Sequence, residues 1–153
     1  MAMPSRLWKI PEGLLVRPDG SWRVGELHVI HPPTLRHLKS HLVFFEAGGA
    51  FVVDGAQRIP VELDGPPFEV VSLVIDAARG TAMAVLDDGS EETVREDSLG
   101  MDPRTGRFHC VVRDGRAKAV LSRPAHQTLL AHAGQEGGRF FLQAGERRLR
   151  VRA

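Results

Sequence analysis

The feature that most constrains this chain is an internal repeat, because a repeat decides the fold before any single element does. Residues 31–61 and 122–151 carry matching residues in the same order once two short length differences are allowed. The ten matches, named in the first segment, are Pro33, Leu38, His41, Gly48, Gly49, Phe51, Gly55, Arg58, Ile59 and Val61. We therefore expect one structural unit to be built twice.

Local signals predict the same elements in both copies. Pro33 and Pro124 stand where a helix can begin, since a proline in the first turn loses no needed N–H. Ser122 is a good N-cap for the second helix, whereas His31 is a poor one for the first. A Gly-Gly pair follows each helix and starts a hairpin, and another hairpin precedes each helix. Each unit is thus predicted to run strand, strand, helix, strand, strand.

These elements predict a single α+β domain over residues 1–153, with mainly antiparallel strands and two short helices. The repeat units span 14–64 and 107–153, and a central hairpin spans 66–106 between them. Neither unit can bury both faces of its sheet alone, so we expect the two to pack around one core.

Composition is that of an ordinary globular protein. Of the 153 residues, 42% are hydrophobic and 25% are charged, as in a typical packed domain. No apolar run approaches the roughly 18–20 residues of a membrane span, and residues 1–11 lack the apolar stretch of a secretory signal. The single cysteine, Cys110, excludes an internal disulfide. We expect a bacterial protein of the cytoplasm that has no membrane partner, and its oligomeric state is left open.

Several motifs resemble an uncharacterised bacterial family, domain of unknown function 1285 (DUF1285). They are the DGSW segment at 19–22 with Gly25 after it, the helix after Pro33 with its glycine-rich hairpin, and the segments 58–70 and 111–130. Where that family usually carries Thr-Pro, this chain has Asp54-Gly55-Ala56. The resemblance implies a strand-rich fold with repeated motifs, and a signalling or regulatory role without a known ligand. It supplies no catalytic residues.

Charge is distributed unevenly along the chain. Residues 62–102 carry 2 basic and 11 acidic side chains, whereas residues 103–153 carry 11 basic and 3 acidic ones. The two segments can lie side by side and neutralise each other, or the basic end can face an anionic partner. We favour charge pairing between the acidic and basic segments, and keep an anionic partner as the alternative hypothesis.

The anionic-partner hypothesis rests on the last strand. Arg148, Arg150 and Arg152 alternate with apolar residues, so a period of two places their guanidinium groups on one face. With Arg113 and Arg123 they are the candidate ligand-binding residues, for an anionic small molecule or an acidic protein surface. No aromatic residues are interleaved along this strand, so a nucleic-acid partner is not expected.

Other candidate sites fall short of a chemical motif. His37 and His41 have the i, i+4 spacing that can hold a metal ion, but no third ligand is evident and helix geometry places both toward solvent. The acidic turn 87–92 lacks the spacing of a calcium loop. There is no GxSxG, GxGxxG or Walker sequence. We therefore assign no catalytic residue, no metal and no cofactor.

The sequence thus favours a non-enzymatic domain that binds a small ligand or has a regulatory or signalling role. The alternative is a protein–protein interaction module that uses an exposed hairpin edge or the charge-asymmetric surface. A small hydrolase ranks third.

Overall fold

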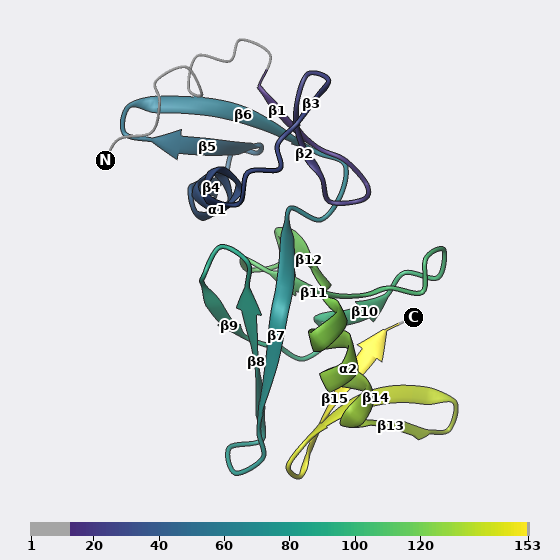
Figure 1. Cartoon of the computed structure of the whole chain (residues 1–153). Coiled ribbons are helices and arrows are strands. Elements are labelled where there is room, and N and C mark those ends of the chain that lie inside the picture. The colour runs from purple at the N-terminus through teal and green to yellow at the C-terminus, as the bar shows by residue number, and fades with distance from the viewer. Residues whose placement is uncertain (1–12, 153) are drawn as a thin grey trace. The chain divides into compact units, whose positions relative to one another are not determined.

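The structure is a computed structural model in which residues 13–152 are described (Figure 1). The expectation that residues 1–11 are not a secretory signal concerns residues outside this range. Chain contacts divide the protein into two compact units, residues 1–67 and 68–153, which we describe separately. That the two repeat units share one core stays a prediction. No helix among the described residues is long and apolar enough to cross a membrane.

The first unit is a six-stranded mixed sheet with one helix. Its strand order is β3-β2-β1-β6-β5-β4, in which β1 runs parallel to β6 and all other neighbours are antiparallel. The elements are β1 (Leu14–Val16), β2 (Trp22–Val24), β3 (Leu27–His28), α1 (Pro32–Ser40), β4 (Leu42–Phe44), β5 (Ala50–Asp54) and β6 (Gln57–Leu63).

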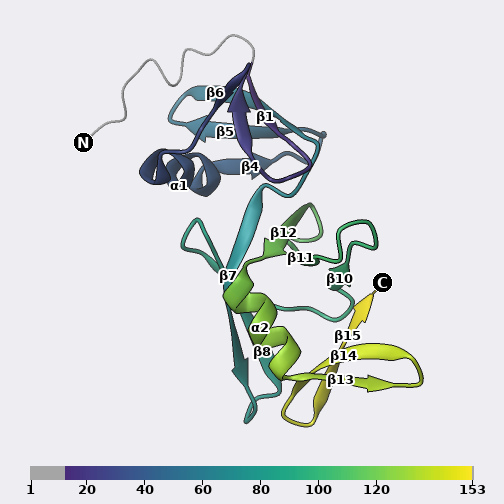
Figure 2. The same cartoon turned by 45° about the vertical axis from the view of Figure 1, so that its right-hand side comes forward.

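The second unit is a nine-stranded mixed sheet with one helix. Its strand order is β13-β14-β15-β10-β11-β12-β7-β8-β9, and β10 and β7 are parallel to β15 and β12. In two views the helix α2 lies along β7, with which it is in contact (Figures 1 and 2). The elements are β7 (Phe68–Asp76), β8 (Thr81–Leu86), β9 (Glu91–Thr93), β10 (Leu99–Met101), β11 (Phe108–Val112), β12 (Ala117–Leu121), α2 (Arg123–Ala131), β13 (Ala133–Glu136), β14 (Arg139–Ala144) and β15 (Arg147–Arg152).

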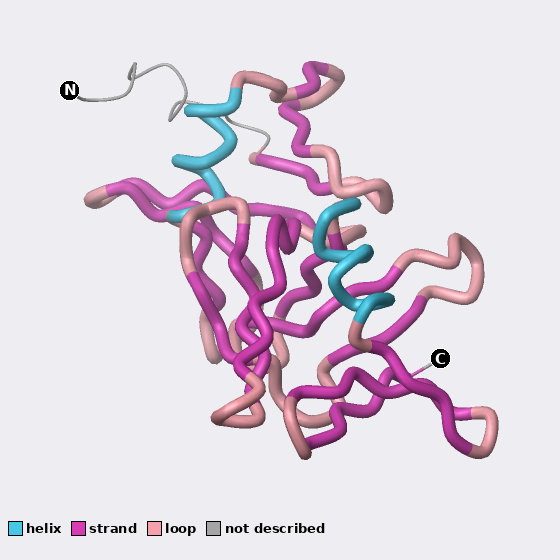
Figure 3. The backbone as a smooth tube through the Cα atoms, turned by 60° about the horizontal axis from the view of Figure 1, so that its bottom comes forward, coloured by secondary structure: helices cyan, strands magenta, loops and turns pink. Residues whose placement is uncertain are grey.

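The predicted α+β class is wrong, because the described residues are 50% strand and only 13% helix. Strands accordingly make up most of the backbone in Figure 3, and the fold is mostly β. Strands were missed where they are short. β4 and β13 lie between each helix and its Gly-Gly pair, and the strand expected over 22–30 breaks at the Gly25 turn, where φ is 57°. Each copy is therefore three strands, a helix and three strands.

The two copies nevertheless share one topology. Strand by strand, the order β3-β2-β1-β6-β5-β4 of the first copy corresponds to the order β12-β11-β10-β15-β14-β13 of the second. The parallel pair, β1-β6 or β10-β15, is at the centre of each order. The second copy thus begins at Leu99, inside the segment that was predicted as a central hairpin. Three further strands, β7 to β9, extend its sheet beside β12.

The helices begin and end as their sequences predict. Ser122 caps α2 by accepting a hydrogen bond from the Ala125 N–H at 3.3 Å, whereas His31 makes no such bond at the start of α1. At each helix end a strand N–H donates to the carbonyl of the C-cap histidine. The Val53 N–H binds His41 at 3.0 Å in the first copy, and the matching bond of the second copy is 2.8 Å. This bond fixes the next residue of the strand beside the helix.

The core of the first unit is anchored by Trp22, which is 1% exposed. Its indole N–H donates to the Pro67 carbonyl at 3.1 Å. A buried carbonyl that loses its donor keeps the full cost of desolvation. Trp22 therefore stabilises the unit through both packing and this bond.

Replacement of Trp22 by phenylalanine should lower the free energy of unfolding by about 1–3 kcal/mol, because the Pro67 carbonyl loses its partner. Urea denaturation followed by circular dichroism measures the loss. The control, Leu27→Ala, removes a side chain that is 68% exposed, and should change stability by less than about 0.5 kcal/mol. Equal midpoints for Trp22→Phe and the native chain would contradict this account of the core.

Candidate functional site

The last strand presents the predicted arginine row on one face of the second sheet. Arg148, Arg150 and Arg152 are exposed, while Leu149 between them is 1% exposed. β15 pairs with β14 over residues 147–150 and with β10 over Val151 and Arg152, so the strand is paired along its length and the spacing of the row is fixed. Gly100 pairs with Arg152 on one side and with His109 on the other, so Arg152 and His109 lie on the same face of the sheet. Phe108, the residue before His109, points to the opposite face and contacts His126 of α2. The arginine row therefore faces away from α2.

Two rings lie on the same face as the arginines. Phe141 pairs directly with Arg150 across β14 and β15, and its ring fills the space above Gly134, where any Cβ would overlap it. The guanidinium of Arg148 lies over this ring at 4.6 Å from its centroid. The sequence of β15 alone gave no sign of an aromatic neighbour, because Phe141 reaches the row only through cross-strand register. The face therefore combines guanidinium groups with an apolar ring.

His109 is the second ring on this face. A Cβ on Gly100 would lie 2.7 Å from the His109 Nε2, so only glycine leaves room for the imidazole. Burial is the main cause that lowers the pKa of His109, Lys118 lowers it further, and Asp102 acts in the opposite direction. The imidazole is therefore neutral near pH 7, and the positive charge of the face comes from arginines.

Carboxylates neutralise only part of this face. Arg148 is ion-paired with Glu136, and the neighbouring Arg147 is paired with Glu96 at 3.2 Å. Within residues 13–152, Arg150 and Arg152 have no ion pair. Two guanidinium groups on the face thus keep their donors available to a ligand.

The other two predicted arginines lie elsewhere. Arg123 is the first residue of α2, exposed, and its helix follows β12, three strand positions from β15. Arg113 lies in the turn between β11 and β12 and is part of the internal framework. The structure therefore groups only three of the five predicted residues on one face.

Arg113 links two hairpins of the second sheet. Its guanidinium binds Asp88 at 2.6 Å and Glu92 at 2.8 Å, and its backbone N–H also donates to Glu92. The side chain of Asp88 is only 3% exposed, and the Arg113 guanidinium also lies 4.7 Å from the Phe68 centroid. These contacts hold Arg113 in the left-handed region at φ 53°. Internal pairing with the acidic segment, the favoured interpretation, accounts for this arginine.

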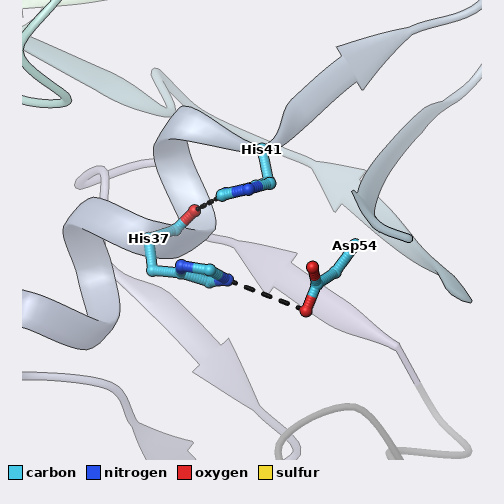
Figure 4. A group of neighbouring side chains, drawn as sticks. All are labelled: His37, His41 and Asp54. Atoms are coloured by element: carbon cyan, nitrogen blue, oxygen red, sulfur yellow. Dashed lines mark hydrogen bonds and ion pairs between the residues drawn. The ribbon is translucent and has the colours of Figure 1, made fainter. Parts of the chain in front are cut away.

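A second cluster lies in the first unit (Figure 4). His37 is on α1, His41 caps its C-terminal end, and Asp54 ends β5. His37 Nε2 is 3.9 Å from Asp54 Oδ2, and the two imidazole centroids are 4.1 Å apart. Burial is the main cause that lowers the pKa of His37, His41 lowers it further, and Asp54 acts against them. The expected solvent-facing histidines are in fact half-buried, since the His37 side chain is 24% exposed.

Asp54 was not among the predicted site residues, because an Asp-Gly pair between two apolar segments is typical of a hairpin turn. Comparison of the two copies contains a usable signal. The position matching Asp54 in the second copy is Ala144, and the position matching His37 is Thr128. A pair of polar groups present in one copy and absent from the other indicates a local role.

Neither the Ser40 hydroxyl, beside the histidine cluster, nor the Cys110 thiol, on β11, is activated as a nucleophile. The Ser40 hydroxyl donates to the His37 carbonyl at 3.0 Å, and His41 Nδ1, only 3.2 Å from that hydroxyl, also faces this carbonyl at 2.8 Å. The imidazole nitrogen beside Ser40 is therefore a donor and does not take its proton. Burial is the main cause that raises the pKa of the Cys110 thiol to about 11, so the thiolate is scarce at neutral pH.

Replacement of Arg113 by alanine should lower the free energy of unfolding by roughly 2–4 kcal/mol, since it leaves the buried Asp88 carboxylate without its cation. The matched control is Arg95→Ala, which breaks an ion pair to Asp114 whose partners are 71% and 79% exposed, and should cost under about 1 kcal/mol. Urea denaturation compares the two. If both variants lose the same stability, Arg113 is not the structural link described.

No protein-family model matches the chain, and no curated protein matches its sequence. Two solved structures do match. A DUF1285 family protein from Silicibacter pomeroyi DSS-3 has a TM-score of 0.67 over 95% of this chain and 85% of that chain, with 21% sequence identity. A DUF1285 family protein from Shewanella baltica OS155 has a TM-score of 0.53 over 77% of this chain and 90% of that chain, with 11% identity.

At these identities the likeness concerns the fold. The match to the Silicibacter pomeroyi protein covers 95% of this chain, so it spans both copies of the repeat and the strands β7 to β9. The predicted resemblance is confirmed: the chain has the fold of the DUF1285 family proteins, whose function is unknown.

Proposed function

We propose that the protein is a non-enzymatic domain with a regulatory role that binds a small anionic ligand on the exposed face of β14 and β15. The observation that carries the proposal is the pair Arg150 and Arg152. Both are exposed, both are on one face of a strand that pairs with β14 at Arg150 and with β10 at Arg152, and neither has an ion pair within residues 13–152. Fixed, uncompensated guanidinium groups bind phosphate or carboxylate with two parallel hydrogen bonds each.

The charge balance of the face supports an anion. Arg139, Arg148, Arg150 and Arg152 share the face by register, and Glu136 is the carboxylate that lies opposite Arg139. Alternate residues of a strand are about 6.6–6.8 Å apart, so one ligand with two anionic groups can reach two neighbouring arginines. Attraction is strongest at low salt, where the screening length is long.

The ring of Phe141 narrows the class of ligand. It packs over Gly134, lies under the Arg148 guanidinium and is only half-buried. An anion that also carries an apolar portion can place that portion against the exposed part of the ring while its charge meets Arg150. We therefore favour such a ligand over a simple inorganic ion.

An acidic protein surface is the alternative partner for the same face. Its carboxylates would meet the same guanidinium groups, so the chemistry is shared and only the size of the partner differs. The small hydrolase remains the third hypothesis, and the contacts of Ser40 and Cys110 give it no support.

A thermal-shift experiment at low salt tests the proposal with inorganic phosphate, citrate and a nucleoside triphosphate as probes. A ligand present at one hundred times its Kd stabilises the folded state by about 2.7 kcal/mol, which raises Tm by roughly 5–10 °C. We expect at least one probe to raise Tm, and the variant Arg150→Ala/Arg152→Ala to abolish the rise.

The matched control is Arg104→Ala/Arg107→Ala, which removes two exposed guanidinium groups from the loop between β10 and β11. It changes the net charge equally and should keep the full shift. No shift with any probe would sink the small-ligand proposal, and binding of an acidic peptide in that case would favour the protein partner. Equal loss in both double variants would show that net charge, and not this face, attracts the anion.

A further inference from the structure

We propose that His37, His41 and Asp54 bind one divalent transition-metal ion, zinc above others, with one coordination position left open. The site lies in the first unit and is independent of the arginine face. Two imidazoles and one carboxylate are ligands that zinc takes in sites with three protein ligands and a fourth position for water or another molecule.

The geometry is close to that of a bound ion. One ligand atom from each of the three side chains lies within 4.8 Å of the other two, and the His37–Asp54 pair is at 3.9 Å. With zinc–ligand distances near 2.0–2.1 Å, tetrahedral ligands lie about 3.3 Å apart. Small side-chain rotations therefore bring the three atoms onto one ion without a change of backbone.

Backbone contacts bring the three residues together. His37 and His41 are one helical turn apart, so their side chains project from the same side of α1. The Val53 N–H donates to the His41 carbonyl at 3.0 Å, which holds β5 against the helix end. Asp54 is the next residue, so its carboxylate is held beside the imidazoles. Figure 4 shows His37 Nε2 directed at that carboxylate.

A backbone carbonyl already fixes which ring nitrogen of His41 carries the proton. Its Nδ1 lies 2.8 Å from the His37 carbonyl, which can only accept, so Nδ1 carries the proton. In the neutral ring the lone pair is then on Nε2. A backbone carbonyl that fixes the tautomer in this way is the usual partner of a metal-binding histidine.

Access and composition also fit a metal ion. The side chains of His37 and Asp54 are 24% and 38% exposed, so an ion can enter from solvent. An ion pair between His37 and Asp54 would need only one imidazole. A metal ion accounts for the second imidazole as well, at 4.1 Å from the first.

The second copy shows that the junction between helix and strand forms without the side chains of His37 and Asp54. The Gln143 N–H donates to the His132 carbonyl at 2.8 Å, as Val53 does to His41. Four residues before His132 stands Thr128, and one residue after Gln143 stands Ala144. The same backbone arrangement is therefore built without two of the three ligands, so those ligands in the first copy are not there to maintain the fold.

The test is a zinc titration of the full chain after removal of metal with a chelator. Isothermal titration gives the stoichiometry and Kd, and the visible spectrum of the cobalt(II) form reports nitrogen and oxygen ligands in a low-coordinate site. We expect one zinc ion per chain. His37→Gln and Asp54→Asn should each weaken binding by more than about tenfold, since loss of even an outer-shell partner costs about 10–100-fold.

Two controls keep the result specific. His132→Gln changes the matching histidine of the second copy, and His28→Gln changes an exposed histidine on β3; both should keep the native affinity. Circular dichroism confirms that each variant is folded. The proposal is overturned if the native chain takes up no zinc, or if Asp54→Asn binds as tightly as the native chain. Loss of binding in His28→Gln alone would likewise assign the ion to surface histidines.

Discussion

The rest of the structure depends on one backbone hydrogen bond that occurs in both copies. In each, a strand N–H donates to the carbonyl of the histidine that caps the helix, Val53 to His41 and Gln143 to His132. The bond joins the helix to the middle strand of a three-stranded half, and the parallel pair of strands joins that half to the other. Because main-chain atoms make these connections, side chains beside them can change without loss of the fold. The copies use that freedom differently.

The first copy carries two imidazoles and a carboxylate at this junction, and the second keeps one histidine, His132, but has threonine and alanine at the other two positions. The second copy instead carries the arginine row on β15, in which Glu136 neutralises Arg148. We therefore propose a cation site in one copy of the repeat and an anion site in the other. The proposals concern separate units and stand or fall separately.

Much of the fold was predictable from local chemistry. Proline and Ser122 predicted the helix starts, a hairpin was expected on each side of each helix, and alternation predicted the face of β15. The strands that were missed, β4, β10 and β13, have only three or four residues, and the Ala-Gly-Gln-Glu sequence of β13 has little strand propensity. They form because neighbouring strands pair with them. The parallel pairings join segments far apart in sequence, which no local signal specifies.

The candidate sites likewise combine features that local sequence predicts with contacts that only the tertiary structure creates. Period two placed Arg148, Arg150 and Arg152 on one face, but the Phe141 ring and the pairing of Arg113 depend on cross-strand register and on a distant hairpin. Asp54 likewise meets His37 only through tertiary packing.

The most direct test of this account is zinc-edge anomalous diffraction from crystals grown with one equivalent of zinc. The account predicts a single strong peak among His37, His41 and Asp54, and none beside His132. A peak at His132, or none at the three ligands, would contradict it.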